Sequence, residues 1–294
     1  MKKLLFILLL SIVSFSSVQA QFTYGTTGLL NMPTADMQKD KTFLFGGGFI
    51  EKHASTGRWF YDTFNYYVNI TFFPWMEVAY TCTLHKAVPQ ESLWVPSTYG
   101  KFVNQDRNFH FRFRLWKEGW WKPWTPQIVV GANDGINNSW AEGSKFKPIT
   151  SDANGFNNRY YVAITKHFDF NHVGELGAHA SWVYNERKEY KLNGLCLGAN
   201  FRFKLKDNGS FLHKAINGLN LMAEAYPADG QGVRNVAIHS GKNPKNFDRG
   251  VAIGKHDINI GACYSFWKDR INLYSEWYGC KDFSGGVQLK ICLK

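Results

Sequence analysis

The feature that most constrains the fold of this chain is a two-residue alternation between apolar and polar side chains. It is clearest over residues 109–116, whose order is Phe109, His110, Phe111, Arg112, Phe113, Arg114, Leu115 and Trp116. Successive side chains of a β-strand point to opposite faces, so a strand would gather the phenylalanines on one face and the arginines on the other. A helix would mix them around its axis. The segment is therefore predicted to be a strand.

The same alternation recurs along the rest of the chain. Segments with apolar residues at every second position are 67–72, 160–165, 197–204, 219–226, 258–264 and 287–293. A further strand-like run, Thr42 to Ile50, contains Gly46-Gly47-Gly48. Within a strand, such glycines indicate small residues facing inward or a bend, rather than a phosphate-binding loop. One short helix is expected within Lys206–Asn217.

The predicted strands are joined by connections of alternating length. Tight turns are expected at Phe73–Trp75, Asp169–His172 and Trp267–Asp269, and long polar loops at 51–62, 86–106 and 134–158. Short turns at one rim and long loops at the other are typical of outer-membrane barrels, whose short turns face the periplasm.

The composition agrees with a barrel. Aromatic residues make up 17% of the chain, which is high for a soluble domain, whereas outer-membrane barrels place aromatic girdles at both membrane interfaces. No apolar run reaches roughly 18 residues, which excludes a bundle of membrane-spanning helices. We predict an all-β fold: a single antiparallel transmembrane β-barrel of about 12 or 14 strands. Residues 233–255 leave the strand number open.

The first 20 residues have the layout of a secretory signal peptide, with basic Lys2-Lys3, an apolar core and the cleavage site Val18-Gln19-Ala20. We expect residues 21–294 to form one domain in the outer membrane of a gram-negative bacterium, in contact with its lipid. The net charge of +11 is compatible with binding to nucleic acid, to an anionic membrane or to an acidic polymer. Export argues against nucleic acid.

The alternation also predicts what the barrel lumen contains. A lipid-facing Lys or Arg costs roughly 2–4 kcal/mol at the bilayer midplane, so the phenylalanine faces must meet lipid and the charged faces the lumen. The candidate residues for contacts in the lumen, with one another or with a bound polymer, are His110, Arg112, Arg114, Arg202, Lys204 and Glu224. Two interpretations stay open: the charges brace one another as ion pairs, or they bind an ionic polymer.

Motifs of enzymes and metal sites are missing from the sequence. There is no Gly-x-Ser-x-Gly elbow, His-Glu-x-x-His helix or Walker-type loop, and the five cysteines form no C-x-x-C pair. We therefore expect no catalytic residues, metal or cofactor. Carboxylates that could hydrolyse a glycan exist, but the sequence cannot place two of them at the required separation; they are Asp134, Glu142, Asp152 and Glu224.

A tryptophan-rich segment runs from Trp116 to Trp124. Its rings could stack on sugars or belong to an interfacial girdle. The girdle is favoured, because Trp prefers the membrane–water interface.

Near its start the chain reads Gly25-Thr26-Thr27-Gly28-Leu29-Leu30-Asn31-Met32-Pro33-Thr34-Ala35-Asp36. The segment 25–36 resembles the opening motif of the YjbH-like family of exopolysaccharide-associated outer-membrane proteins. The matching positions are Gly28, Leu29, Pro33, Thr34 and Ala35, whereas Asp36 stands where the family commonly has Arg. Weaker similarities cover Ile128–Gly135 with Tyr160–Lys166, and Leu219–Tyr226.

The resemblance implies a β-barrel linked to secretion or assembly of an exopolysaccharide. A positively charged lumen would suit an acidic polysaccharide, and envelope export components are expected as further partners. It supplies no catalytic residue. The motif itself is interpreted as seating the N-terminal segment against the barrel, since Pro33 fixes φ and Gly25 and Gly28 permit a sharp entry. The alternatives are a general porin or small-solute channel, a barrel enzyme, and a secreted carbohydrate-binding β-sandwich.

Overall fold

The computed structural model describes residues 21, 23–52, 62–87, 89, 95–135, 158–185, 192–206, 210–227 and 250–293, with backbone only for 104–106. Several predictions lie outside these residues: the signal peptide at 1–20, the interiors of the long loops including Glu142 and Asp152, and most of the segment 233–255.

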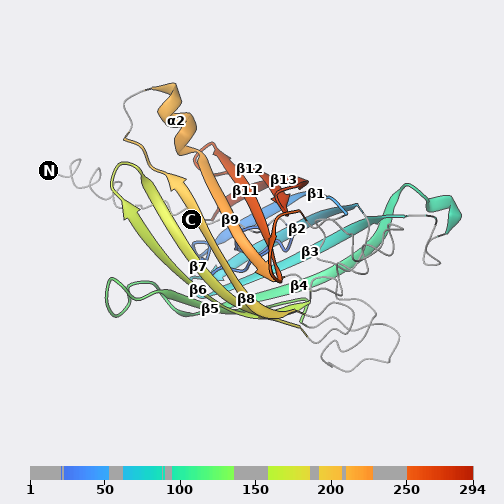
Figure 1. Cartoon of the computed structure of the whole chain (residues 1–294), viewed down its shortest axis with the longest axis horizontal. Helices are drawn as coiled ribbons and strands as arrows, with labels where there is room; N and C mark the ends of the chain where they lie inside the picture. Colours follow the sequence, from blue (N-terminus) through green and yellow to red (C-terminus); the bar gives the residue numbers. More distant parts are fainter. Residues whose placement is uncertain are drawn as a thin grey trace.

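The strands form one antiparallel sheet that closes on itself (Figure 1). They are β1 (Thr42–Ile50), β2 (Thr63–Phe73), β3 (Met76–Lys86), β4 (Phe102–Trp116), β5 (Gln127–Asn133), β6 (Arg159–Phe170), β7 (Gly174–Tyr184), β8 (Asn193–Phe203), β9 (Leu219–Pro227), β10 (Ala252–Ile253), β11 (His256–Phe266), β12 (Ile271–Tyr278) and β13 (Asp282–Cys292).

Two pairings close the ring. Strand β13 pairs with β1, and β9 pairs with β11, while the two-residue β10 pairs with the end of β11. The barrel therefore has 12 strands, an even number as in single-chain bacterial barrels. This confirms the predicted fold class and selects the lower of the two strand numbers. Because no strand of the closed ring is left unpaired, the barrel has no open edge.

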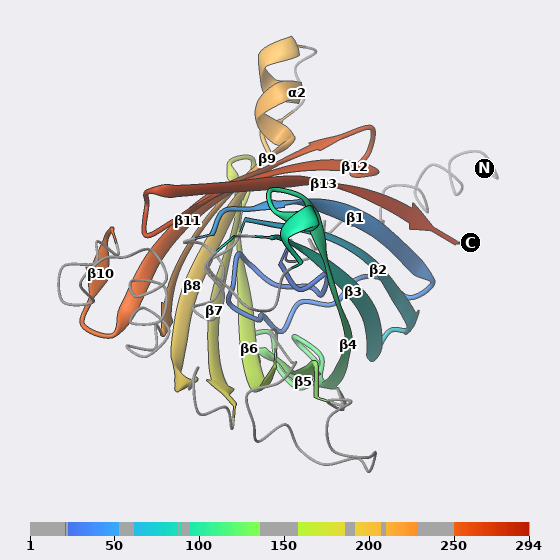
Figure 2. The ribbon, with the colours of Figure 1, turned by 90° about the vertical axis from the view of Figure 1, so that its right-hand side faces the viewer.

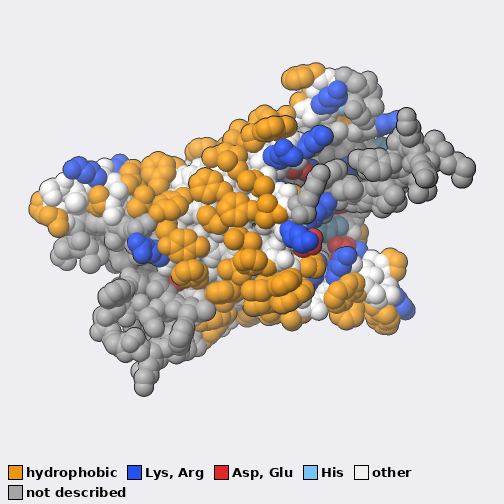
Figure 3. All heavy atoms as spheres, turned by 180° about the vertical axis from the view of Figure 1, so that it is seen from behind, with side chains coloured by type: hydrophobic (Ala, Val, Ile, Leu, Met, Phe, Trp, Pro, Cys, Tyr) orange, Lys and Arg blue, Asp and Glu red, His pale blue; other side chains and the backbone are white. Residues whose placement is uncertain are grey.

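The outer surface of the barrel is apolar. Large hydrophobic side chains exposed around it include Phe45, Phe72, Phe109, Ile164, Trp182, Leu197, Leu221, Leu273 and Leu289. Hydrophobic side chains cover much of the barrel face seen in Figure 3. The lumen side is polar instead, and its buried residues include Asn69, Glu77, Arg112, Arg159, Glu224 and Gln288. An apolar outside around a charged inside is the arrangement that a lipid bilayer selects, and the chain is an outer-membrane barrel.

One end of the barrel carries the turns at 74–75, 171–173 and 267–270, and we call it the turn end. In outer-membrane barrels such an end faces the periplasm. Two longer connections also lie there, 117–126 and 204–218, and the second contains α2 (Phe211–Asn217), the predicted short helix. At the opposite end, β12 and β13 are joined by a tight turn at 279–281. The alternation of loop lengths is therefore less strict than the sequence suggested.

The short helices of the chain lie in these connections. Helix α2 begins after Ser210, whose hydroxyl accepts a hydrogen bond from the backbone N–H of Leu212, and η1 spans Pro96–Thr98 at the opposite end. Among the described residues, none of the helices has the length and apolar character needed to cross a membrane.

The glycines of β1 provide room inside the barrel. A Cβ atom on Gly46 would lie 2.5 Å from the phenolic oxygen of Tyr67, whose side chain is buried in the lumen. This confirms that the predicted strand Thr42–Ile50 carries a small residue facing inward rather than a phosphate loop.

The segment that precedes β1 fills the lumen. Figure 2 shows this blue segment inside the ring of strands. Its apolar side chains Leu29, Leu30, Met32, Ala35 and Met37 join inward-facing residues of the wall in one buried cluster, among them Val129, Ala163, Val183, Cys196 and Met222. We call residues 21–37 the plug. The core of this protein is thus made between the plug and the barrel wall.

Candidate functional site: the lumen plug and the cavity beneath it

The plug is a compact irregular chain with a sharp turn in its middle. Gly28 and Pro33 form an isolated antiparallel bridge, and the backbone N–H of Leu29 donates to the carbonyl of Met32 at 3.1 Å. Gly25 has a φ of +65° and lies against the ring of Tyr67, so a side chain there would meet both strain and a clash. Glycine is required at this entry to the lumen.

Glu224 of β9 binds the tip of that turn. Its carboxylate accepts hydrogen bonds from the backbone N–H groups of Leu30, Asn31 and Met32 at 3.2, 2.9 and 2.8 Å. The side-chain amide of Asn259 donates a further bond at 2.9 Å. Successive N–H groups that converge on one anion form a backbone nest. The buried charge of Glu224 is therefore compensated by the main chain of the plug.

A buried ion pair holds the plug on both sides of the turn. Glu77 and Arg112 lie directly opposite each other on β3 and β4, and their side chains meet at 3.1 Å. Glu77 accepts from the backbone N–H and the hydroxyl of Thr27, both at 2.7 Å. Arg112 donates to the carbonyls of Thr34 and Asp36. The pair thus binds the chain before and after the turn.

Arg159 at the start of β6 is the third point of attachment. Its guanidinium donates to the carbonyl of Asn31 and to the side-chain oxygen of Gln21, the latter at 2.9 Å. It also lies 3.5 Å from the ring centroid of Tyr24, in cation–π geometry. Since Glu224 binds the N–H of Asn31 and Arg159 binds its carbonyl, one residue of the plug bridges two opposite buried charges.

Neutral side chains complete the attachment. Hydrogen bonds join wall residues to plug backbone groups at Asn65–Thr23, Asn69–Gly25, Thr81–Tyr24, Gln127–Ala35 and Thr165–Ala35. Together with the charged residues they come from β2, β3, β4, β5, β6 and β9. The plug is consequently bound by half of the barrel wall rather than by a single strand.

The wall is also shaped to receive the apolar side chains of the plug. A Cβ atom on Gly198 would lie 2.6 Å from Leu29 and 2.8 Å from the sulfur of Met32. A Cβ atom on Gly261 would lie 2.5 Å from Leu30. Glycine at these two wall positions leaves space for the side chains of the plug. Any larger residue would occupy that space.

Beneath the plug, toward the turn end, lies a cavity of about 480 Å³. The plug and the segment after it contribute Gly28, Leu29 and Asp36–Asp40, and the wall contributes Arg114, Lys117, Glu118, Gln127, His167, Glu175, Asn200, Arg202, Asn220 and Met222. The cavity is lined by charges of both signs and by amides, with only a few apolar side chains.

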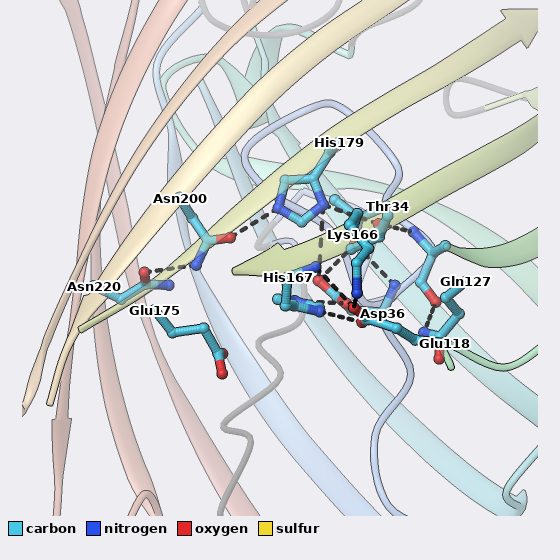
Figure 4. A network of polar contacts seen from close by, with 12 residues as sticks. Thr34, Asp36, Glu118, Gln127, Lys166, His167, Glu175, His179, Asn200 and Asn220 are labelled. Atoms are coloured by element: carbon cyan, nitrogen blue, oxygen red, sulfur yellow. Dashed lines mark hydrogen bonds and ion pairs between the residues drawn. The ribbon is translucent and has the colours of Figure 1, made fainter. Parts of the chain in front are cut away.

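A polar network connects this cavity to the connection 117–126 (Figure 4). Glu118 accepts from Lys166 at 2.5 Å and contacts His167 at 2.7 Å, and His167 in turn lies 3.3 Å from Asp36. Burial raises the pKa of Glu118, but the hydrogen bonds from His167 and Lys166 outweigh it and hold this pKa at about 2. The end of the plug is therefore linked through His167 to the tryptophan-rich connection.

The predicted lumen residues all lie on the lumen side, but they divide into three groups. Arg112 and Glu224 hold the plug, and His110 is fully buried between Thr81 and Asn133. The other three lie near the turn end: Arg114, Arg202 and Lys204. The role proposed for all of them, contact with a polysaccharide, stays a prediction.

The motif residues occupy the plug itself. Gly28 and Pro33 form the bridge that closes the turn, Leu29 fills the space beside Gly198, and Thr34 and Ala35 offer their carbonyls to wall side chains. Asp36, which departs from the family pattern, pairs with His167. The motif therefore seats the N-terminal segment within the lumen, deeper than the sequence suggested.

Glu77 and Arg159 were not singled out from the sequence. Glu77 alternates with Met76 and Val78, so parity along β3 could have placed it in the lumen. Arg159 stands at the first position of its strand, next to the long connection 134–158, where alternation has too few residues to be recognised.

The part of the chain that the structure describes contains neither a cluster of metal ligands nor a disulfide bond. No three His, Cys, Asp or Glu side chains gather there as metal ligands. Cys82, Cys196, Cys263, Cys280 and Cys292 are unpaired.

The tryptophan-rich segment leaves the barrel at the turn end of β4. Trp116, Trp120, Trp121 and Trp124 are exposed by 37, 62, 65 and 63%. Rings exposed at the rim of the apolar band fit the interfacial girdle that was favoured from the sequence.

Comparison with known proteins gives one family match. The sequence model of the YjbH family, described as "Exopolysaccharide biosynthesis protein YbjH", matches residues 20–138. This confirms the predicted resemblance over the plug and strands β1–β5. Of the weaker similarities, Ile128–Gly135 lies within the matched range, whereas Tyr160–Lys166 and Leu219–Tyr226 lie beyond it. A search of curated proteins finds no match.

Among solved structures, the chain is similar to a KdgM porin at 8% identity and a TM-score of 0.42, covering 86% of this chain and 99% of that one. It is also similar to OccK11 (OpdR) of Pseudomonas aeruginosa at 8% identity and a TM-score of 0.26, covering 84% of this chain and 63% of that one. The barrel assignment rests on the strand pairing of this chain itself.

Proposed function

We propose that this chain, whose residues 20–138 match the YjbH family model, is a non-enzymatic outer-membrane barrel that takes part in exopolysaccharide secretion or assembly. In its resting state the lumen is closed by the plug. The link to exopolysaccharide is supported by the family match, and the closed state by the geometry of the lumen. Envelope components of polysaccharide export are the partners that such a role requires.

The observation that carries the closed state is the attachment of the plug to buried charges. Hydrogen bonds to charged groups contribute about 1.5–3 kcal/mol each, and Glu224, the Glu77–Arg112 pair and Arg159 each make several. A free-energy difference of about 5.5 kcal/mol between closed and open states already limits the open state to about one molecule in 10⁴. A lumen closed in this way argues against the alternative function of a general diffusion porin.

Two of the four carboxylates considered for glycan hydrolysis, Asp134 and Glu224, lie in the described structure, and their surroundings support a non-enzymatic role. Glu224 is fully engaged by the backbone of the plug and by Asn259. Asp134 is buried beside Asn108, whose side-chain amide can donate to both of its oxygens. Neither carboxylate lines the cavity at the turn end.

The test combines conductance with a cellular assay. In planar bilayers the wild-type protein should show no steady conductance, whereas a variant with a weakened plug, Glu224→Gln, should open. In the source bacterium, deletion of the gene should reduce surface exopolysaccharide, and the wild-type gene should restore it. A steady open channel in the wild type would instead support the porin, and unchanged exopolysaccharide after deletion would refute the proposed role.

A further inference from the structure

Several of the charges around the turn-end cavity are paired. Arg202 donates to both carboxylate oxygens of Asp269 at 3.0 Å, and Lys204 meets Glu175 at 2.7 Å. Glu118 is engaged by Lys166 and His167, and Asp36 by His167, as described above.

Arg114 differs from these paired groups. Its side chain lines the cavity from β4, two residues beyond Arg112 on the same face of the strand. Its Nε atom is buried and has no hydrogen-bond partner among the residues that the structure describes. None of the described carboxylates lies within ion-pair distance of its guanidinium, since Asp36 and Glu77 act on it only from farther away. A half-buried guanidinium with a vacant donor is a feature that an anionic ligand would satisfy.

The rest of the cavity suits a sugar. Side-chain amides of Gln127, Asn200 and Asn220 line it from β5, β8 and β9, and amides hydrogen-bond to hydroxyl groups in either direction. The apolar side chains of Leu29, Met37 and Met222 lie in the same lining and could pack on the C–H face of a sugar ring. The volume of about 480 Å³ is within the range of small-molecule sites.

The surrounding charges also select the kind of anion. A guanidinium binds carboxylate and phosphate groups alike. Asp36, Glu118 and Glu175 line the same cavity, however, and would repel the second negative charge of a phosphate monoester. A single carboxylate therefore fits this cavity better than a phosphate.

We propose that the turn-end cavity binds an acidic sugar unit through an ion pair between the sugar carboxylate and Arg114. This deepens the proposed function, on which it rests, by assigning the polysaccharide a uronic-acid component and a point of entry at the turn end. The unit would bind beneath the closed plug, in contact with Leu29 and with the segment Asp36–Asp40, where the plug leads into β1.

The experiment is calorimetric titration of the full chain in detergent with two matched disaccharides. One is cellobiouronic acid, which carries a single carboxylate, and the other is cellobiose, which carries none. Wild-type protein is compared with Arg114→Gln, with the charge-preserving Arg114→Lys, and with Arg270→Gln. Arg270 is a matched control because it is an exposed arginine at the same end that does not line the cavity. Heat-modifiable gel migration checks that each variant is a folded barrel.

We expect wild-type protein to bind cellobiouronic acid at least about tenfold more tightly than cellobiose, and Arg114→Gln to lose about tenfold in affinity for the acid. Arg114→Lys should retain part of the preference, Arg270→Gln all of it, and the preference should shrink as salt is added. Equal affinity of wild-type and Arg114→Gln protein for the acid, or equal affinity of the wild type for both disaccharides, would overturn the proposal. Inorganic phosphate that binds as tightly as the acid would also overturn it.

The outcome can be separated from that of the proposed function. Binding of the acid that depends on Arg114 in a barrel with steady conductance would preserve this site and refute the closed state. A closed barrel needed for surface exopolysaccharide, without this binding, would preserve the function and refute the site.

Discussion

Replacing Glu224 by glutamine should loosen the plug without disturbing the hydrogen-bonded ring of strands. The carboxylate accepts three backbone N–H groups of the plug and the amide of Asn259. Glutamine keeps one acceptor oxygen, but it places an NH₂ group against N–H donors. The variant loses the negative charge and at least one hydrogen bond, which at about 1.5–3 kcal/mol per charged hydrogen bond gives a loss of about 3 kcal/mol in plug binding.

A loss of that size changes the plug equilibrium by roughly 150-fold, since about 1.4 kcal/mol corresponds to a factor of ten. Hydrogen exchange followed by mass spectrometry would detect it as faster exchange at the amides of Leu30, Asn31 and Met32, by up to about two orders of magnitude. Amides in the barrel strands should exchange as in the wild type, because the sheet itself is untouched.

Glu175→Gln is the matched control. Glu175 is also a carboxylate on the lumen side of the barrel, but it pairs with Lys204 and makes no hydrogen bond to the plug in the described structure. Its replacement should leave exchange in the plug within about threefold of the wild type. If Glu224→Gln also remains within that range while the protein still shows heat-modifiable migration, Glu224 does not hold the plug and the reasoning fails.

Three further predictions follow from the same geometry. Gly261→Leu should fill the space of Leu30 and produce channel openings in planar bilayers, and a silent channel with a folded barrel would contradict the fit described here. The pKa of Glu118 is lowered to about 2 from 4.5, so its carboxylate stabilises the folded state above pH 4.5 and this stabilisation is lost as the pH falls toward 2. Thermal unfolding of the protein between pH 5 and 2 should show this loss, and Glu118→Gln should remove that part of the pH dependence. Arg112→Met should destabilise the protein by about 3–5 kcal/mol because it leaves Glu77 buried and unpaired, whereas adding Glu77→Gln should recover part of this loss in denaturant unfolding; no recovery in the double variant would show that the pair is not coupled.

The barrel could be predicted from the sequence because alternation is a local property. Residues 109–116 alone show which side chains of β4 meet lipid, and the structure places Phe109 outside and Arg112 inside as expected. The even strand number follows from closure with antiparallel pairing throughout, but the choice of 12 depends on how β9 pairs with β11 across 228–251. That pairing is non-local, and nothing in the alternation encodes it.

The plug was harder to predict, because its interactions are carried by the main chain. The motif Gly28–Ala35 has no amphipathic period and no charged residue, so it gives no indication that four charged wall residues converge on it. From the sequence, the lumen-facing charges were expected either to pair with one another or to bind an ionic polymer. The structure shows an ion pair in Glu77–Arg112, but Glu224 and Arg159 are compensated by peptide groups, a solution that neither alternative included.

The way in which Asn31 is held has a consequence for how much the plug can change in sequence. Glu224 binds its N–H and Arg159 its carbonyl, and neighbouring contacts also fall on peptide groups. Every amino acid except proline offers these same groups, so the charged wall tolerates almost any side chain at this position. Sequence drift in the turn is then limited by the space beside Gly198 and Gly261, not by the charges. A proline scan of residues 30–32 would separate these two constraints, because proline removes an N–H group while remaining small.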